Sequence, residues 1–567
     1  YHLQNGSACV DYGQDLSAKG VTNDLEGAAR AGAYDIGCYQ SSYSAASRSL
    51  ATYVDASRPD ESGDGTSWAT AKRTIGTGLA FTSPGGTCTV AAASYHENVF
   101  IPANMTVSGT NRDLTVVSSA WHVAELVETN ATIRSLTLQG GLRGVNVLAD
   151  GARIADCVLR GNTNGVSQTS QRTYVDNCVL TNNANNGIHV YFGGASGMGL
   201  TARNCLIARN GAEGMYVERD NGGGNQFHVY DCTVVSNGSH GYRFYGYSCP
   251  TFFTNTILAL NNGYATFYSG CWGGPVQYLN YCDVHGNVLG GHTNNTSTPQ
   301  LGANMIAADP VFAGGVDFRL TNGSPCIDAG FDMSAAGITN DLDSMPRTNA
   351  FDIGCYETTL PPPPKYDLVF VDASRPDDSG AGTNWATAKK TIGSGLSILS
   401  ATGTCTVGGG LYNENVSVPA NRQLTGTNWN TVIISNIGNV VTLGDTNSTL
   451  RDVTVLGGSR GVNVSGASNL VEHCQFRGSS DAGVYVSAAG NMIRGCVFRG
   501  NTNGLGQNSV QTVVENCVAV SNALAGIRVN FGGVGGYPGL TARNCLIAWN
   551  GDSGMYVERD NGGGNPF

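Results

Sequence analysis

Charged side chains are scarce in this chain. Asp, Glu, Lys and Arg together make up 13% of its 567 residues, against about 25% in typical soluble domains. The 31 basic residues are scattered and the formal net charge is -11, so the chain has no Lys- or Arg-rich run of the kind that neutralises phosphates. We therefore expect no nucleic-acid partner.

Long apolar runs are also missing. No stretch approaches the roughly 20 apolar residues that a membrane-spanning helix needs, so we expect no membrane span. The first residues, from Tyr1 to Asn5, lack the charged and apolar regions of a signal peptide, which favours a mature protein or a piece of one. Hydrophobic residues still reach 41%, enough for a sizeable core.

Metal-binding and catalytic motifs are lacking as well. The 17 cysteines include no C-x2-C pair and the 9 histidines do not cluster, so a zinc site is disfavoured. No Ser/His/Asp arrangement or phosphate-binding loop rises above chance. We expect no metal and no cofactor, with calcium as the one alternative kept open, and we lean toward a protein that is not an enzyme.

Glycine and internal repetition are abundant instead. Glycine accounts for 79 residues, about twice its usual share. Three segments recur at one common offset: 5–39 returns as 322–356, 53–60 as 370–377, and 67–72 as 384–389. Residues 539–565 repeat 199–225 in a similar way. Such self-similarity is typical of a tandem array of modules.

These repeats divide the chain into five parts. We interpret 1–40 as the C-terminal tail of a preceding module, 41–52 as a linker and 53–360 as a complete module. Residues 361–366 form a Pro-rich linker, stiff because it contains four consecutive prolines, and 367–567 form a second module that is truncated. The simplest account is a window on a longer tandem array.

Within each module a shorter pattern predicts the fold. A cysteine is followed five residues later by an asparagine, then by glycine and alternating apolar residues; the pairs are Cys157/Asn162, Cys178/Asn183, Cys205/Asn210, Cys232/Asn237, Cys282/Asn287, Cys496/Asn501, Cys517/Asn522 and Cys545/Asn550. The separation of Cys157 and Cys178 in the sequence gives the length of the shortest coil, and longer separations between later cysteines indicate loop insertions. Stacked coils about 4.8 Å apart would place like residues above one another, and period-two alternation argues against helices. The pattern predicts an all-β parallel β-helix, a solenoid of stacked coils.

The modules resemble a known family, the secreted right-handed parallel β-helix proteins of the pectate-lyase-like superfamily found in environmental bacteria. The start motif, Val54-Asp55-Ala56-Ser57 through Trp68-Ala69-Thr70-Ala71, is similar to that family's N-terminal cap of a strand and a short helix. The end motif, from Asp309-Pro310-Val311-Phe312 to Asp341-Leu342-Asp343, resembles its C-terminal segment, which often precedes surface-anchoring regions. The resemblance implies an extracellular or cell-surface protein, but the fold serves lyases, hydrolases, adhesins and structural proteins alike.

The cysteines fall into two classes. In the family, positions 326 and 355 are usually alanine, whereas here both are cysteine and the same pair occurs in the preceding tail, at 9 and 38. We predict Cys9–Cys38 and Cys326–Cys355 disulfides, with four buried thiols as the alternative. The cysteines of the coil pattern are expected to be free and to pack as small hydrophobes, while Cys249 and Cys271 could bridge adjacent coils.

An outward-facing stripe is the candidate site. Aligning the coils places His189, Tyr216 and Arg243 in one column, and Tyr191, Glu218, Tyr245 and Phe267 in a second column two residues on. With the loop residues Arg219 and Asp220 beside it, the stripe could lie along a sugar chain. The alternative is an ordinary solvated sheet, where such side chains add only ~0.2–1 kcal/mol per cross-strand pair.

Two readings of function remain. The loop 218–225 recurs at 558–565, which suits packing between copies, a glycan contact or calcium, although Glu218, Asp220 and Asn221 offer few oxygens for calcium. Arg528 and Asn530 replace His189 and Tyr191 in the second module, so a catalytic set built on these positions would not repeat. We favour an extracellular structural protein whose partners are further copies of itself, forming a fibre, sheath or surface layer. The alternative is a polysaccharide-binding adhesin or a polysaccharide lyase or hydrolase.

Overall fold

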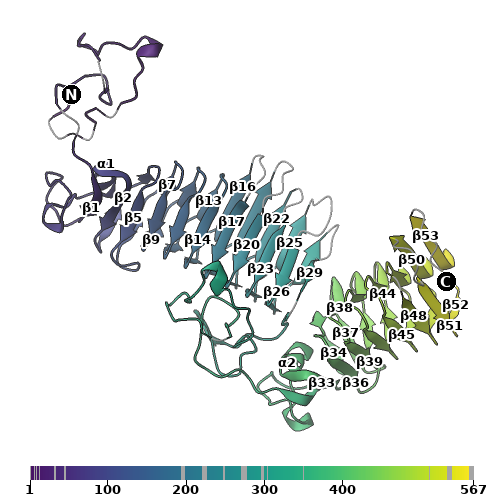
Figure 1. Ribbon diagram of the computed structural model, residues 1–567. Helices are drawn as coiled ribbons and strands as arrows, with labels where there is room; N and C mark the ends of the chain where they lie inside the picture. Colours follow the sequence, from purple (N-terminus) through teal and green to yellow (C-terminus); the bar gives the residue numbers. More distant parts are fainter. Residues whose placement is uncertain are drawn as a thin grey trace. The chain divides into compact units, whose positions relative to one another are not determined.

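The computed structural model describes residues 2–4, 7, 9–11, 13–30, 33–43, 46–192, 198–219, 226–246, 250–269, 277–294, 299–302, 304–348, 350–509, 511–532 and 539–560. The chain forms two compact units, Tyr1–Phe192 and Gly193–Phe567, and each is described by itself. Most of both units is made of short strands that stack side by side (Figure 1).

In the first unit three parallel sheets run side by side, and each coil of chain contributes one strand to each of them. The first sheet contains β1 (Ser49–Val54), β2 (Thr82–Val90), β5 (Thr106–Gly109), β8 (Thr132–Arg134), β11 (Arg153–Ala155) and β14 (Thr173–Asp176). The second contains β3 (Ser94–His96), β6 (Val116–Ser118), β9 (Thr137–Gln139), β12 (Val158–Arg160) and β15 (Val179–Thr181). The third contains β4 (Val99–Ile101), β7 (His122–Leu126), β10 (Arg143–Val147), β13 (Asn164–Gln168) and β16 (Ile188–Phe192).

The second unit holds two such sets of three parallel sheets. Its first set consists of β17 (Met198–Arg203), β20 (Gln226–Tyr230), β23 (Thr251–Thr254), β26 (Gln277–Asn280) and β29 (Gln300–Leu301); of β18 (Leu206–Ala208), β21 (Thr233–Val235), β24 (Ile257–Ala259) and β27 (Asp283–His285); and of β19 (Met215–Arg219), β22 (Tyr242–Tyr245), β25 (Tyr264–Ser269) and β28 (Gly290–Asn294). An antiparallel pair, β30 (Phe312–Gly314) and β31 (Asp317–Leu320), follows.

The second set begins at residue 366. Its sheets consist of β32 (Tyr366–Val371), β33 (Leu399–Val407), β36 (Gln423–Gly426), β39 (Thr449–Arg451), β42 (Leu470–Glu472), β45 (Met492–Arg494), β48 (Thr512–Glu515) and β51 (Leu540–Arg543); of β34 (Gly410–Tyr412), β37 (Val432–Ser435), β40 (Thr454–Leu456), β43 (Gln475–Arg477), β46 (Val497–Arg499), β49 (Val518–Val520) and β52 (Leu546–Ala548); and of β35 (Val416–Ser417), β38 (Asn439–Leu443), β41 (Arg460–Val464), β44 (Ala482–Val486), β47 (Asn503–Gln507), β50 (Ala525–Gly532) and β53 (Ser553–Asp560).

Helices are few and short. The α-helices α1 (Ile75–Ala80) and α2 (Ile392–Ser397) pack against the first strands of their sheets, β1–β2 and β32–β33. Four 3-10 turns complete the helical structure of the described residues: η1 (Ser17–Lys19), η2 (Trp68–Thr70), η3 (Ser334–Ala336) and η4 (Trp385–Thr387). The predicted all-β parallel β-helix with short helical N-terminal caps is confirmed.

Like residues stack because neighbouring strands pair in register. Val158 and Leu159 of β12 lie beside Val179 and Leu180 of β15, and both leucines are fully buried. Side chains of a strand point alternately inward and outward, so each coil delivers one apolar side chain per sheet to a continuous core. One coil alone could not bury these side chains, and stacking therefore stabilises the whole solenoid.

The predicted asparagine column is a hydrogen-bonded ladder. The side-chain oxygen of Asn237 accepts hydrogen bonds from the backbone N–H and the amide of Asn210, at 3.1 and 3.0 Å. Asn237 donates in the same way to Asn261, at 3.1 and 2.9 Å, and also donates to the Ile207 carbonyl. Asn261 donates in turn to Asn287. The ladder satisfies buried polar groups that would otherwise destabilise the turn.

The coil-pattern cysteines form a second ladder. Within the second unit Cys205 lies beside Cys232, and Cys496 lies between Cys474 and Cys517. These side chains are buried, and burial raises the pKa of the Cys232 and Cys496 thiols well above the usual value. The Cys232 and Cys496 thiols are therefore protonated at neutral pH, and the buried cysteines of the ladder pack as small apolar groups.

The two predicted disulfides are not supported by the structure. All four cysteines, Cys9, Cys38, Cys326 and Cys355, are free thiols. Cys326 donates to the carboxylate of Asp283 at 3.5 Å, while the backbone N–H of Cys355 donates to Thr233 at 3.1 Å. The two cysteines therefore pack onto two different coils, and docking of the segment accounts for their repeated spacing. Cys249 and Cys271 lie outside the described residues.

The segment 324–358, here called the exit segment, folds back onto one edge of the preceding β-helix. That edge carries residues with left-handed backbone, among them Asn204, Asp231 and Asn255, with φ of 51°, 50° and 50°. We call it the turn edge. Asn255 donates to the Phe331 carbonyl and accepts from the Phe331 N–H, both at 2.7 Å.

Arg347 is the centre of this contact. Its fully buried guanidinium donates to Asn204 at 3.1 Å, and it lies 3.8 Å from the carboxylate of Asp231, which is also fully buried. It further pairs with Glu357 at 2.9 Å and donates to the carbonyls of Asp352 and Gly354. A buried cation with this many partners holds the exit segment and the coils together.

The docking of the exit segment is expected to weaken as the pH rises. Burial raises the pKa of Asp231 from 3.8 to about 7, and burial also raises the pKa of Asp352 to about 7. A carboxyl group whose pKa is higher in the folded state stabilises it at low pH, and that contribution is lost between about pH 4 and about pH 7. Hydrogen-exchange protection of the Phe331 and Gly354 amides, corrected for intrinsic rate, should fall over this range. Asp231→Asn should flatten the dependence; unchanged protection in the native chain would contradict the expectation.

Candidate functional site

The outward stripe in the second unit lies on β19, β22 and β25. Tyr216 pairs with Arg243, and Glu218 pairs with Tyr245, as the sequence predicted. Phe267 was placed wrongly: it lies opposite Arg243, and Ser269 is the neighbour of Tyr245. A shift of two residues keeps a side chain on the same face but moves it to the other column, so Phe267 still belongs to the stripe.

Arg243 is held between two aromatic rings. Its guanidinium carbon lies 5.0 Å from the centre of the Tyr216 ring and 5.8 Å from that of Phe267. It also forms an ion pair with the buried carboxylate of Glu213 at 3.2 Å. The positive charge is thus balanced and the side chain is fixed. Together, Tyr216, Arg243 and Phe267 present two aromatic rings next to a guanidinium group.

The aromatic surface extends past Phe267. The His240 ring stacks on Phe267 at 4.5 Å with an angle of 5° between the planes, and its Nδ1 accepts the Tyr264 N–H at 2.9 Å. Burial lowers the pKa of His240, so its ring is neutral at pH 7. The sequence reasoning missed His240 and Tyr264 because they fall outside the aligned columns.

The other four predicted site residues do not lie on the described part of β19 and β22 in the same way. His189 and Tyr191 lie on β16 of the first unit, where His189 pairs with Ser167 and is half-buried, while Tyr191 is exposed. Arg219 ends β19, with its side chain outside the described part of the chain, and Asp220 lies outside the described residues altogether. Within the second unit, Tyr216, Glu218, Arg243 and Tyr245 lie together on β19 and β22.

The second β-helix carries a related set. On β50 and β53, Arg528 pairs with Tyr556, and Asn530 pairs with Glu558. The Arg528 guanidinium carbon lies 5.8 Å from the centre of the Tyr556 ring, and its Nη2 forms an ion pair with Glu558 at 3.0 Å. Tyr556 and Glu558 occupy the sequence positions of Tyr216 and Glu218. An arginine thus contacts the same tyrosine in both β-helices, although it comes from the following coil in one and from the preceding coil in the other.

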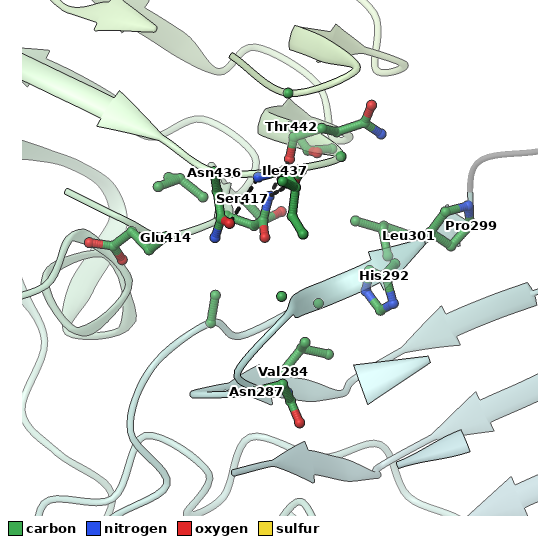
Figure 2. Close-up of a pocket in the computed structure, with 18 of the residues that line it drawn as sticks. Val284, Asn287, His292, Pro299, Leu301, Glu414, Ser417, Asn436, Ile437 and Thr442 are labelled. Atoms are coloured by element: carbon green, nitrogen blue, oxygen red, sulfur yellow. Dashed lines mark hydrogen bonds between the residues drawn. The ribbon is translucent and has the colours of Figure 1, made fainter. Parts of the chain in front are cut away.

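A pocket of ≈ 730 Å³ also lies in the second unit (Figure 2). Its lining includes His292, Leu301, Glu414, Ile437 and Asp481. The sequence analysis singled out none of these residues.

The charged groups of the pocket already have structural partners. Glu414 accepts hydrogen bonds from the backbone N–H groups of Ile392 and Gly393, at 2.8 and 2.9 Å, and thereby caps α2. Burial raises its pKa to about 7. Glu97 caps α1 in the same way, and Asp481 is paired with Arg460 at 2.9 Å. We therefore take the stripe, and not this pocket, as the candidate site.

The described residues show neither a metal-binding group nor a membrane-spanning helix. No three His, Cys, Asp or Glu side chains among them gather into a metal-binding group. No helix within the described ranges has the length and apolar character needed to span a bilayer. The calcium alternative depends on Asp220 and Asn221, which lie outside the described residues, and so stays untested.

Comparisons with known proteins concern the fold. A family model described as a right handed beta helix region matches residues 123–306 and 424–566, and no curated protein matches the chain. The crystal structure of pectate lyase Pel9A has 13% identity and a TM-score of 0.42 over 55% of this chain and 97% of its own.

Two further structures cover more of the chain. The PL6 family alginate lyase AlyGC has 9% identity and a TM-score of 0.24 over 85% of this chain and 97% of its own. Tailspike protein gp49 from Acinetobacter baumannii bacteriophage Fri1, a capsular polysaccharide depolymerase, has 8% identity and a TM-score of 0.23 over 88% of this chain and 62% of its own. At such identities and TM-scores none of the three assigns a site or a function to this chain.

Proposed function

The chain belongs to the right-handed β-helix family, and from that premise we propose that it is an extracellular protein that binds a polysaccharide along the stripe of β19, β22 and β25. The observation that carries the proposal is the Arg–Tyr contact, which both β-helices have. Sugar rings have apolar C–H faces that pack on aromatic rings, and hydroxyls at their edges that bond to charged side chains. Tyr216, Tyr245 and Arg243 supply both kinds of contact side by side.

The charge balance favours a neutral polysaccharide. Arg243 and Arg528 are each already paired with a glutamate, so neither charge is left over for an acidic sugar. The net charge of -11 would also repel a polyanion. An uncharged, extended glycan that runs along the solenoid axis could contact several coils at once, because the stripe crosses the neighbouring strands β19, β22 and β25.

Binding should depend on the two tyrosines of the stripe. In affinity electrophoresis through gels that contain neutral or acidic polysaccharides, we expect a neutral polymer to retard the protein. Tyr216→Ala combined with Tyr245→Ala should weaken binding about tenfold or more, because two aromatic contacts are lost. Tyr43→Ala is the matched control, since Tyr43 is 43% exposed, close to the 49% of Tyr245, but lies off the coils.

Three results would redirect the proposal. Equal retardation of the double variant and the native protein would remove the stripe as the site. Retardation by alginate or pectin alone would contradict a neutral ligand. Release of unsaturated oligosaccharides from any polymer would identify a lyase, the enzymatic form of the alternative.

A structural role in an array of modules is the second candidate. It is supported by the recurrence of the start motif, the cap helix and the coil pattern in the second β-helix. Electron micrographs of the purified chain that show ordered filaments would favour this role, and a monodisperse monomer would favour the glycan-binding protein.

A further inference from the structure

Residues 7–41 are here called the N-terminal segment, and its described residues fold like those of the exit segment 324–358. Arg30 donates to the carbonyls of Asp35 and Gly37 at 3.1 and 2.6 Å, and Arg347 donates to those of Asp352 and Gly354 at 3.2 and 2.7 Å. The two segments thus keep the same arginine at the centre of the same loop.

The described backbone of the two segments also makes the same hydrogen bonds. The Ile36 N–H donates to the Cys9 carbonyl and the Leu25 N–H donates to the Cys38 carbonyl. The corresponding bonds of the exit segment run from Ile353 to Cys326 and from Leu342 to Cys355, with nearly equal lengths. The N-terminal segment therefore forms its loop without the coils on which the exit segment rests.

The two segments differ in what covers them. Leu25 is 71% exposed and Ile36 is 53% exposed, whereas Leu342 and Ile353 at the same positions are 5% and 0% exposed. Cys38 is exposed and Cys355 is fully buried. One hollow of ≈ 630 Å³, which we call the docking face, is lined by the exposed residues Val21, Leu25, Ile36 and Cys38 together with the half-buried Arg30.

The turn edge is what covers the equivalent face of the exit segment. A side-chain carbon added at Gly354 would lie 2.8 Å from Thr233 Oγ1 and 2.9 Å from Ile257 Cδ1, so the loop touches these coils directly. The Gly354 N–H donates to the Asn255 carbonyl at 2.8 Å, and Arg347 reaches Asn204 and Asp231. Gly37 keeps the positive φ of Gly354, at 123° against 110°, and so retains the glycine that permits this approach.

We propose that the N-terminal segment is a docking element whose partner is the uncovered turn edge of another right-handed β-helix module. The partner's chemistry follows from the exit segment: left-handed Asn, Asp and Asn on three consecutive coils, with a threonine shortly after the Asp. Arg30 enters between the first two of these residues, and Ile36 and Cys38 pack on the neighbouring coil. This proposal is independent of the glycan-binding function.

An exchange within the full chain tests the fit. Residues 324–358 are replaced by a second copy of 7–41, which has the same length. The thiol that replaces Cys355 should then react with a maleimide at least about tenfold more slowly than Cys38 in the same molecule, because docking protects it. Peptide mapping separates the two thiols, since different residues follow them. Equal reaction rates would overturn the proposal.

A matched variant shows that protection comes from docking. Ile36→Asp in the exchanged copy places a carboxylate where Ile353 is fully buried, so the thiol should react as fast as Cys38.

If the exchanged chain fails to fold, Arg347→Glu in the native chain provides a second measurement. This change places two carboxylates together at Asp231 and frees the turn edge. The N-terminal segment of a second copy should then bind there, giving a concentration-dependent dimer by sedimentation that Ile36→Asp abolishes. A monomer with a reactive Cys355, or a dimer that ignores Ile36→Asp, would overturn the proposal.

Discussion

Replacing Arg347 with alanine is expected to destabilise the docked exit segment by about 3–5 kcal/mol, the range for removing one partner of a buried ion pair. The guanidinium is fully buried, and so is the carboxylate of Asp231. The variant would leave the Asp231 carboxylate and the carbonyls of Asp352 and Gly354 without their cationic donor. Undocking should expose Cys355, whose thiol then reacts with a maleimide.

The matched control is Arg319→Ala. Arg319 lies close to the exit segment and pairs with Asp317 and Asp343, but half of its side chain is exposed. Exposed ion pairs contribute about 0–1 kcal/mol, so Cys355 should remain protected in this variant. A protected Cys355 in Arg347→Ala, with unchanged thermal unfolding, would show that Arg347 does not hold the segment.

The second large effect is expected at Asn237, inside the asparagine ladder. Asn237→Ala removes the bonds that its amide donates to Ile207 and Asn261, and it removes the oxygen that accepts from the N–H and the amide of Asn210. Each buried polar group left without a partner costs about 1–3 kcal/mol, so we expect a loss of about 3 kcal/mol or more in chemical unfolding. Hydrogen exchange should be fastest in the coils next to residue 237.

Asn262→Ala is the comparison for this variant. Asn262 lies next to Asn261 but faces solvent, and its amide donates only to the Gly238 carbonyl at 3.3 Å. The loss of a single exposed bond should change stability by less than about 0.5 kcal/mol. Equal losses in the two variants would mean that the ladder adds nothing beyond the turn itself.

The ladders could be predicted because the coil spacing alone places like residues in register. Cys232 and Asn237 recur at the same relative positions on consecutive coils, so parallel pairing must bring each beside its counterparts. Tyr216 and Arg243 could be paired for the same reason. Phe267 could not be placed correctly, because the coil from Arg243 to its partner Phe267 is shorter than the coil from Tyr216 to Arg243. The sequence does not show where a turn loses residues.

The docking of the exit segment could not be derived from spacing. Cys326 and Cys355 are close in the chain, and their joint recurrence was read as a covalent link, whereas each contacts a coil far away in sequence. A better signal was present in Arg30 and Arg347, which occupy the same place in the two repeated segments of a chain with little charge. The capping roles of Glu97 and Glu414 left a similar trace, since both follow the cap helix at the same distance.

The buried cysteine ladder determines how this protein responds to reagents. The nucleophilic form of cysteine is the thiolate, and burial raises the pKa of the ladder residue Cys282 to about 12. At neutral pH this sulfur neither attacks electrophiles nor exchanges with glutathione. We therefore expect the thermal unfolding of the described coils to be the same with and without a reducing agent.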